Sequence, residues 1–364
     1  MKICLLGNGL SSLVLAKILS KKNINVDNFI KQKKRYFAKF RTVGISKSNV
    51  EFLEKFYPNI SKLGNPIYEI KVYDERNINS QIINFNYQKS IKFYIFKYKE
   101  LYNFLKNKLK NEKKIKKISY KNNYNFYSKE IKKKYDLIFD TDLNSIYSIK
   151  HFLSKIEKNY NSNAYITFIN HKTVNNNIAR QVFTKFGPIA FLPLNESTTS
   201  IVFSIKSSGK KLNDKNLKEL IKKYNFYYQN IKFKSFESFK LSFSIMRKYR
   251  KENILAFGEK LHKIHPLAGQ GFNMSIRDII ILVEIIDKKI NLGLPIDKFV
   301  FEEFEKKVKY KNTLFSSGID IIYELFLLQN KIPEVISKNL FKILNKNKIF
   351  NKYSELIANK GFNF

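Results

Sequence analysis

The sequence predicts an α/β fold in which a Rossmann-like parallel sheet is assembled from separated stretches of the chain and an antiparallel sheet is inserted between them. Three observations lead to this prediction. Residues 1–30 have the pattern of a strand, a glycine-rich turn, a helix and a second strand, which is a βαβ opening. Residues 66–98 and 164–205 alternate polar and apolar side chains, as antiparallel strands do. After residue 250, a buried strand, a glycine-rich loop and an apolar helix follow one another.

Local signals place the individual elements in chain order. The first apolar run ends at Gly7-Asn8-Gly9, and the next one has helical spacing. Gly187-Pro188 indicates a turn, and Asn213 or Asp214 is a suitable helix cap. We expect strands at 1–6, 25–30, within 66–98, at 135–139, within 164–205 and at 253–257, with helices at 13–19, 100–109, 214–223 and 275–290 and a mostly helical chain after Pro295.

Composition indicates a folded protein with a sizeable core. The chain has 364 residues, of which 44% are hydrophobic and 15% aromatic, too many apolar side chains for a disordered protein. Its one cysteine, Cys4, excludes an intramolecular disulfide and a cysteine-based zinc cluster, and we expect no metal site. A reducing, cytoplasmic setting fits this cysteine usage best.

The net charge of +38 has three interpretations. A basic chain can bind nucleic acid or an anionic membrane surface. The charge can also reflect composition alone, because Lys, Asn, Ile, Phe and Tyr, the residues of AT-rich codons, are all abundant. Lysines are spread along the whole chain and far outnumber arginines, so we expect no nucleic-acid partner.

The chain also lacks the sequence signals of an integral membrane protein. No apolar run approaches the ~20 residues of a membrane-spanning helix, and the N-terminus has no signal-peptide pattern. We expect a cytoplasmic protein that is soluble or peripheral on the inner face of the cytoplasmic membrane. An apolar stripe formed by Ile319, Ile322, Leu325 and Phe326, together with residues 336–344, has two interpretations: helix packing or contact with an anionic bilayer.

Gly7-Asn8-Gly9-Leu10-Ser11-Ser12 stands where a dinucleotide fingerprint belongs, between a strand and a helix. In that motif the first glycine permits the tight turn, the second lets the backbone approach a pyrophosphate, and a small third residue allows close packing of helix on strand. Ser12 is small enough for the third position. A plain strand–turn–helix with two glycines is the alternative. The acidic residue expected at the end of the second strand is absent, because Ile30-Lys31 occupies that place.

The stretch from Gly258 to Asn273 is more specific. A buried strand ends in Gly258-Glu259, the loop continues through His265-Pro266, and Gly269-Gln270-Gly271 leads into a helix. The glycines let backbone N–H groups approach a ligand closely, and the helix directs its positive end to the same place. Such a site suits a ring system that carries negative charge, for example a reduced isoalloxazine.

At these residues the sequence resembles the flavin-dependent aromatic hydroxylases of ubiquinone biosynthesis, within the para-hydroxybenzoate hydroxylase superfamily. The order and spacing of the motifs run through nearly the whole chain. The resembling stretches are Gly7-Asn8-Gly9, Arg41 within residues 40–46, residues 186–194, and residues 258–273 continuing to Arg277-Asp278.

The resemblance implies a domain division and a reaction. Its FAD-binding domain comprises 1–65, 96–150 and 246–300, its substrate domain 66–95 and 151–245, and residues 301–364 form a C-terminal helical segment. The implied enzyme is an FAD-dependent monooxygenase that takes electrons from NAD(P)H. It uses O₂ to form a flavin C4a-hydroperoxide and hydroxylates the aromatic ring of a polyprenylated ubiquinone precursor. Other proteins of quinone biosynthesis are implied partners.

The resemblance also assigns roles to residues. Pro266 to Gly269 would lie at the flavin face, and His265 either fixes this loop or satisfies its carbonyls. Phe191-Leu192-Pro193 would line the substrate side. The implied cofactor-binding residues are Gly7, Gly9, Ser12, Arg41, Asp142, Gly258, Glu259, Ala268, Gly269, Gln270, Gly271, Phe272 and Asn273.

Several positions depart from the family pattern. Ser12 replaces the third glycine and Lys31 the ribose acid, while Leu143 replaces the glycine of an Asp-Gly motif. Lys260 and Leu261 stand where small residues are usual. These departures leave an alternative open: a catalytically weak homologue that acts as a lipid-intermediate-binding or scaffold subunit of quinone biosynthesis.

Overall fold

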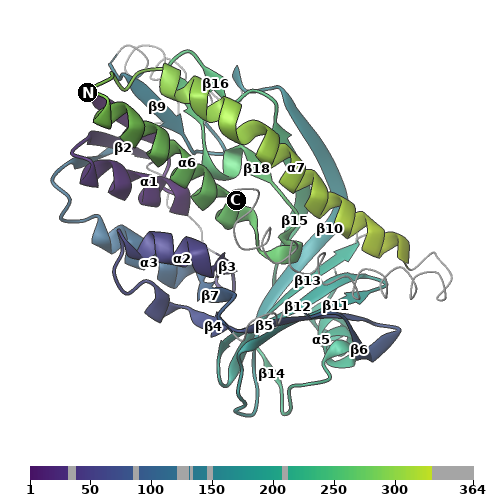
Figure 1. The fold of residues 1–364 in the computed structure, drawn as a ribbon. Helices are drawn as coiled ribbons and strands as arrows, with labels where there is room; N and C mark the ends of the chain where they lie inside the picture. The colour runs from purple at the N-terminus through teal and green to yellow at the C-terminus, as the bar shows by residue number, and fades with distance from the viewer. Residues whose placement is uncertain are drawn as a thin grey trace.

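A parallel sheet forms one half of the molecule and a large antiparallel sheet forms the other (Figure 1). The computed structural model describes residues 1–31, 38–84, 90–120, 131, 134–145, 151–206 and 212–329. Among these residues the parallel sheet has the order β16 (Arg250–Lys251), β17 (Ile254–Ala256), β9 (Leu137–Asp140), β1 (Lys2–Leu6), β2 (Asn25–Lys31) and β8 (Ile115–Tyr120). Only the edge strand β16 runs antiparallel to its neighbour here.

The central strand β1 connects stretches that are far apart in the chain. Leu5 is in register with Asn28 on β2 and with Phe139 on β9, and Phe139 is in turn in register with Leu255 on β17. Helix α1 (Leu10–Lys21) is buried along nearly its whole length, because it lies between this sheet and helices α3 (Tyr98–Lys108) and α6 (Gly271–Asn291). The predicted βαβ opening is therefore confirmed.

The antiparallel sheet supplies a second core. Its order in the described residues is β18 (His262–Lys263), β15 (Glu237–Met246), β10 (Lys155–Asn170), β13 (Thr198–Lys206), β12 (Gly187–Asn195), β11 (Ile178–Thr184), β5 (Glu69–Asp74) and β6 (Asn77–Asn84), with β14 (Lys232–Phe233) paired to β10. Among these pairs only β5 runs parallel to its neighbour, β11. Helix α5 (Asp214–Tyr224) covers one face, where Leu217 and Ile221 are buried. Asn213 is its cap, since the Asn213 side chain accepts a hydrogen bond from the Asn216 amide.

A small sheet joins the two halves. It has the order β3 (Thr42–Ser46), β7 (Phe93–Lys97) and β4 (Asn65–Ile67). Helix α2 (Lys47–Glu54) and the 3₁₀ turn η1 (Ser61–Leu63) lie between β3 and β4 in the chain. Ile67 and Phe93 of this sheet pack in one cluster with Ala179 and Leu192 of the large sheet. The strands within 66–98 are thus divided between two sheets. The boundaries between the domains stay a prediction.

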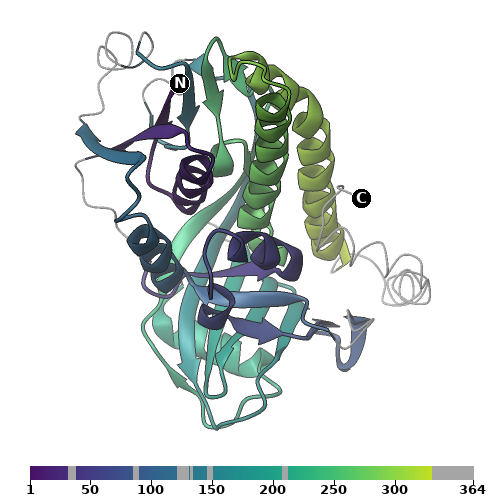
Figure 2. The ribbon, with the colours of Figure 1, turned by 60° about the vertical axis from the view of Figure 1, so that its left-hand side comes forward.

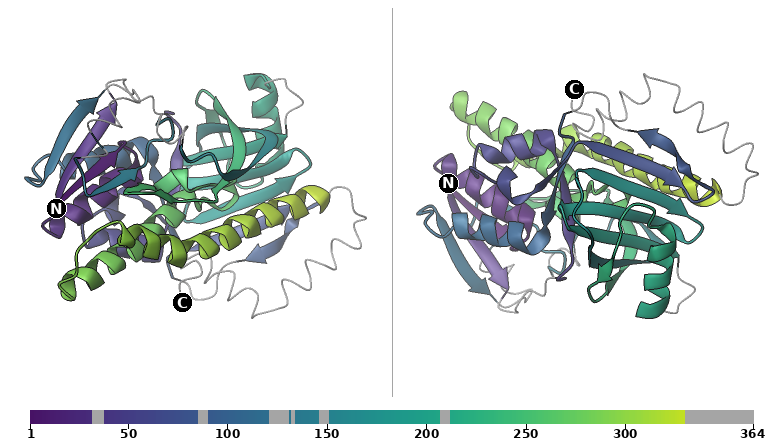
Figure 3. Two further views of the ribbon diagram at one scale, coloured as in Figure 1. Left: turned by 90° about the horizontal axis from the view of Figure 1, so that it is seen from above. Right: turned by 90° about the horizontal axis from the view of Figure 1, so that it is seen from below.

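Helices α6 and α7 (Phe299–Gln329) run side by side (Figure 2), linked by a hydrogen bond from Asn312 to Asp278. Seen from above, α7 extends from the parallel sheet along the antiparallel one (Figure 3). Together these layers confirm the predicted fold class. In the described part of the chain, no helix combines the length and the apolar character needed to cross a bilayer.

Two local predictions differ from the structure. Helix α6 begins at Gly271, four residues before the expected start, because left-handed Gly269 (φ 60°) ends the preceding turn and Gln270 leads directly into the helix. Gly187 and Pro188 belong to strand β12, and the turn consists of Lys185 and Phe186.

The apolar stripe on α7 is also divided by the structure. Ile319 is buried against Met274 and Phe315, whereas Ile322 and Leu325 are exposed. The side chain of Phe326 and all of residues 336–344 lie outside the described residues.

Candidate cofactor site

The Gly7–Ser12 turn connects the carboxyl end of β1 to α1. Gly7 has a φ of 116°, and a Cβ at this position would lie 2.4 Å from the Thr141 hydroxyl oxygen, so only glycine fits. The Ser12 hydroxyl donates a 2.8 Å hydrogen bond to the Gly7 carbonyl, which closes the turn. Ser12 is fully buried, so its small side chain lets the helix pack tightly onto the strand.

The first turn of α1 is open to an anion. Gly9 is its N-cap, no side chain caps it, and no acidic residue lies in the first turn. Its free N–H groups and the positive end of the helix dipole therefore remain available at the carboxyl edge of the parallel sheet. A phosphate group would be stabilised at this position.

The second glycine motif lies directly against this turn. Gly258, in the 3₁₀ turn η3 (Gly258–Lys260), has a φ of 70°, and a Cβ there would be 2.9 Å from the Ser11 side chain. Next to it, Glu259 accepts a 3.3 Å hydrogen bond from Arg41, whose guanidinium lies over the Tyr98 ring. The structure thus brings together three predicted cofactor-binding stretches that are distant in the chain.

His265 fixes the loop that follows. Its Nδ1 accepts a hydrogen bond from the Leu267 amide at the start of the 3₁₀ turn η4 (Pro266–Ala268), and its ring stacks on Tyr323 of α7 at 4.0 Å. Burial lowers the pKa of His265 to about 3, so the ring is neutral at physiological pH. Of the two alternatives for His265, this geometry favours fixing the loop.

Asn273 holds the loop against the small sheet from the other side. Its Oδ1 accepts hydrogen bonds from the Ser46 amide and the Asn49 side chain, both at 2.9 Å. Its Nδ2 donates to the carbonyls of Gly44 and Gly269 at 2.9 and 3.1 Å. A single fully buried amide therefore ties together the loop, the first turn of α6, strand β3 and helix α2.

The N-terminus of α6 lies at the end of this loop. Gln270 is its N-cap without a side-chain cap bond, and its amide oxygen accepts a hydrogen bond from buried Arg277. A Cβ at Gly271 would meet nothing within 4 Å, so there is open space beside the first helical residue. A negatively charged ring edge could approach the backbone there. Phe272 is instead buried in the core of the parallel half.

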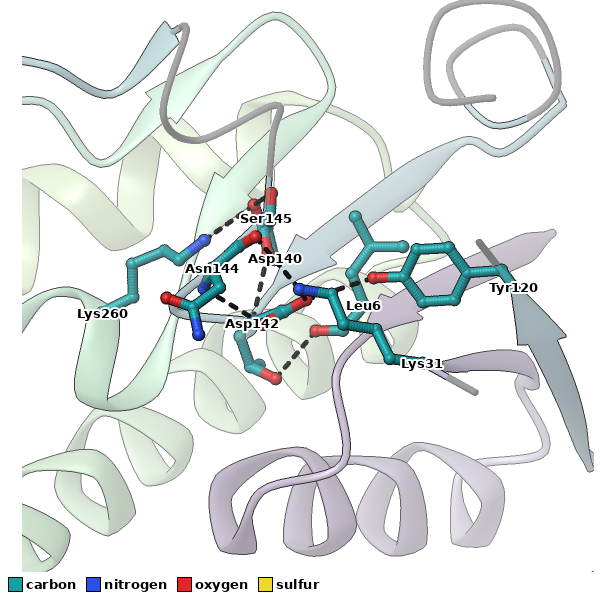
Figure 4. A network of polar contacts seen from close by, with 9 residues as sticks. Leu6, Lys31, Tyr120, Asp140, Asp142, Asn144, Ser145 and Lys260 are labelled. Carbon is teal, nitrogen blue, oxygen red and sulfur yellow. Dashed lines mark hydrogen bonds and ion pairs between the residues drawn. The ribbon is translucent and has the colours of Figure 1, made fainter. Parts of the chain in front are cut away.

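Charged side chains form a network beyond the carboxyl ends of β2 and β9 (Figure 4). Lys31 Nζ forms a 2.7 Å ion pair with Asp142 and a 3.0 Å hydrogen bond with the Asn144 carbonyl. The Tyr120 hydroxyl donates to the same Asp142 oxygen at 3.2 Å. Asp142 is therefore bound by Lys31, the last residue of β2. The family pattern has an acid at the position of Lys31.

A second, more deeply buried pair lies beside the first. Lys260 Nζ is 2.9 Å from Asp140 Oδ2, with side-chain exposures of 4% and 0%. The Ser145 hydroxyl donates to the same oxygen at 2.7 Å. Burial lowers the pKa of Lys260, while the carboxylates of Asp140 and Asp142 oppose that shift. Leu261 is fully buried in the core of the parallel half.

The predicted substrate-side residues lie on strand β12 and alternate between its two faces. Phe191 is buried in the core beneath α5, whereas Leu192 packs with Ile67 and Phe93 at the junction with the small sheet. Pro193 is buried. Of the three, Leu192 is the one that contacts the small sheet.

Comparisons with known proteins agree with this geometry. The family model described as "FAD binding domain" matches residues 154–291. The mitochondrial ubiquinone biosynthesis monooxygenase of Caenorhabditis elegans is 22% identical over 227 residues, covering 50% of each chain. The 3-demethoxyubiquinol 3-hydroxylase of Escherichia coli is 26% identical over 159 residues, covering 42% of this chain and 40% of its own.

The chain therefore resembles FAD-binding monooxygenases in sequence, and its residues 154–291 match an FAD-binding domain.

Solved structures extend the likeness to the whole fold. The p-nitrophenol 4-monooxygenase of Pseudomonas putida superposes with a TM-score of 0.76 at 11% identity, covering 100% of this chain and 98% of its own. An FAD complex of HpxO from Klebsiella pneumoniae gives 0.74 at 10% identity, covering 98% and 99%. By contrast, the chain spans about half the length of the curated relatives that it matches in sequence.

Part of this region fits FAD. The N-termini of α1 and α6 have no side-chain cap, and a Cβ at Gly271 would meet nothing within 4 Å, so the backbone there is open to a ligand. Beside β1, Lys31 and Lys260 depart from the family pattern, but each pairs with a carboxylate. The sequence analysis did not identify Tyr120, Asp140 and Ser145, which bind Asp142 or Lys260 or support those contacts. For Asp140 and Ser145 the only signal was a group of polar residues after a buried strand.

Proposed function

We propose that this flavoprotein hydroxylates the aromatic ring of a polyprenylated ubiquinone precursor, with NAD(P)H as reductant and O₂ as co-substrate. The observation that supports this most is the loop from His265 to Asn273, which Asn273 fixes beside the open N-terminus of α6. The names of two relatives, a ubiquinone biosynthesis monooxygenase and a demethoxyubiquinol hydroxylase, support the substrate class.

The residues of the chain bind and orient in this proposal. The first turn of α1 would hold the pyrophosphate, and the first turn of α6 would face the pyrimidine edge of the isoalloxazine. Arg41 and Glu259, already paired, would lie beside the ribityl chain. When bound, the reduced flavin supplies the activation of O₂ and the transfer of one oxygen atom to an electron-rich ring.

His265 acts as a positioning residue in this proposal. Its low pKa makes it a weak base at neutral pH, so holding the Leu267 amide and stacking on Tyr323 are its contributions. The hydrophobic residues around Phe272 exclude water from the base of the loop. No acid–base triad is required.

A purified sample tests this function directly. We expect flavin absorbance near ~450 nm after reconstitution with FAD, and NAD(P)H oxidation that a prenylated phenol stimulates. With ¹⁸O₂, mass spectrometry should find one labelled oxygen in the product. NAD(P)H oxidation without a hydroxylated product from any prenylated phenol would contradict the substrate assignment.

The Lys31–Asp142 and Lys260–Asp140 pairs favour a second candidate function, a catalytically weak subunit that binds or presents a lipid intermediate. Both pairs place protein charge where a ligand is expected. This candidate predicts a colourless protein that binds the prenylated precursor but cannot be reconstituted with FAD. Retention of the precursor by such a protein, measured by equilibrium dialysis, would support it over the monooxygenase.

Peripheral attachment to an anionic cytoplasmic membrane is part of the first proposal. The exposed side chains of Ile321, Ile322 and Leu325 on α7 support it, as does the net charge of +38. Flotation with anionic vesicles, but not with neutral ones, is the expected result. Replacing Ile322 and Leu325 with Gln should weaken the flotation.

A further inference from the structure

The ion pair between Lys31 and Asp142 crosses the carboxyl end of β1. In the parallel sheet β1 lies between β2 and β9, Lys31 ends β2, and Asp142 follows β9. The two side chains meet beside Leu6, the last residue of β1 (Figure 4). Gly7 follows at once, so the pair lies over the entrance to the α1 turn.

This place has a defined role in dinucleotide-binding sheets. The crevice beyond the carboxyl ends of the strands holds the cofactor, and an acid at the end of the second strand accepts a hydrogen bond from the ribose. An ammonium group has only donors and cannot accept that bond. Lys31 therefore cannot do what an acid does there, and its Nζ is held by two acceptors, Asp142 and the Asn144 carbonyl.

The two lysine pairs differ in how easily they open. Lys260 and Asp140 are almost fully buried, with exposures of 4% and 0%, so separating them would leave a charge without a solvent shell. Lys31 and Asp142 are 28% and 14% exposed, so water can solvate both groups when they part. After opening, Asp142 would still accept hydrogen bonds from Tyr120 and the Asn144 amide.

We propose that the Lys31–Asp142 pair is a latch over the adenosine half of the crevice, which must open before FAD is seated. The inference rests on the FAD site of the proposed function and adds a specificity-determining residue to it. The latch opposes binding of the adenosine half only. A flavin that ends at the ribityl phosphate does not meet it.

Flavin binding to the apoprotein tests the latch without any turnover. We would titrate wild type and Lys31→Gln with FAD and with riboflavin 5′-phosphate and follow flavin fluorescence. Lys31→Gln should bind FAD about fivefold more tightly, the effect of removing one partly exposed ion pair. Its affinity for riboflavin 5′-phosphate should not change.

Two further variants separate the latch from a general effect of charge. Lys31→Arg keeps the pair and should bind FAD as wild type does. Lys47→Gln removes the same charge from an exposed pair with Glu51 on α2 and should also leave FAD affinity unchanged. Circular dichroism confirms that each variant is folded.

The outcomes distinguish the latch from the proposed function. FAD affinity that is unchanged or weaker in Lys31→Gln overturns the latch alone, as does an equal change for both flavins. An effect of Lys31→Arg as large as that of Lys31→Gln also overturns it. If no variant binds either flavin, both the latch and the monooxygenase proposal fail.

Discussion

Beside the N-terminus of α6, Asn273 fixes the loop through uncharged hydrogen bonds to four backbone or amide groups. Beside the N-terminus of α1, the contacts are instead two ion pairs, Lys31–Asp142 and Lys260–Asp140. Neutral amides in a buried site are fully satisfied by local partners and hold one geometry. The free energy of a buried ion pair, by contrast, changes when a charged ligand binds beside it. The comparison teaches that the α6 end is held rigidly by neutral hydrogen bonds, and that the α1 end depends on charge balance.

The largest effect is expected at the buried Lys260–Asp140 pair. Lys260→Met removes one partner and leaves Asp140 uncompensated, which should lower the free energy of unfolding by about 3–5 kcal/mol. Urea denaturation measures the loss. The double variant Lys260→Met/Asp140→Asn should recover most of it, and Lys31→Gln should cost less than about 1 kcal/mol. A Lys260→Met single variant as stable as wild type would show that the Lys260–Asp140 pair does not stabilise the fold.

The uncharged end should be nearly as sensitive at one residue. Asn273→Ala leaves the groups that it binds without partners and should lower the free energy of unfolding by about 2–4 kcal/mol. Asn49→Ala removes the side chain that donates to Asn273 and should cost less. Urea denaturation of both variants provides the check. Equal losses would mean that the loop is not tied through Asn273.

The neutral state of His265 makes the α6 end sensitive to acid. Its pKa is depressed from an ordinary value near 6.5 to about 3, so the unfolded chain binds a proton that the folded chain does not. Stability is thus complete above pH 6.5 and is lost as pH falls from there toward 3. Between pH 7 and 5, wild type should lose about 2 kcal/mol more than His265→Gln. Parallel pH dependences of their urea midpoints would contradict the assignment.

The smallest expected effect concerns the contact between the two glycine motifs. Gly258→Ala adds both left-handed strain and a contact with Ser11, at a cost of about 1–2 kcal/mol. Gly293 has a φ of 65°, and a Cβ there would meet nothing within 4 Å, so Gly293→Ala should show the strain alone. Thermal unfolding of both variants measures the difference. Equal shifts in the melting temperatures of the two variants would contradict a close contact between the η3 turn and α1.

Much of the fold could be predicted because its signals are local. The strand–turn–helix at residues 1–30, the Asn213 cap and the strand before Gly258 depend on spacing and on residue types that neighbours in sequence display. The early start of α6 could not be predicted, because it follows from the left-handed conformation of Gly269. The division of residues 66–98 between two sheets depends on tertiary packing.

The site was predictable in its glycines and less so in its charges. Gly7, Gly258 and Gly269 are recognisable because the backbone conformations they adopt favour glycine. Lys31 and Lys260 were recognisable only as departures. Their partners, Asp142 and Asp140, become evident once β1 is known to lie between β2 and β9. No pattern in the sequence pairs residues across that distance.

The placement of β9 between β1 and β17 has a consequence for biosynthesis. Phe139 pairs with Leu5, which is synthesised before it, and with Leu255, which is synthesised more than a hundred residues later. Until then one edge of β9 has no neighbour, and an open edge is a template for intermolecular pairing. While the residues between β9 and β17 are being synthesised, the nascent chain is therefore prone to aggregation. Pairing of β17 with β9 ends this state.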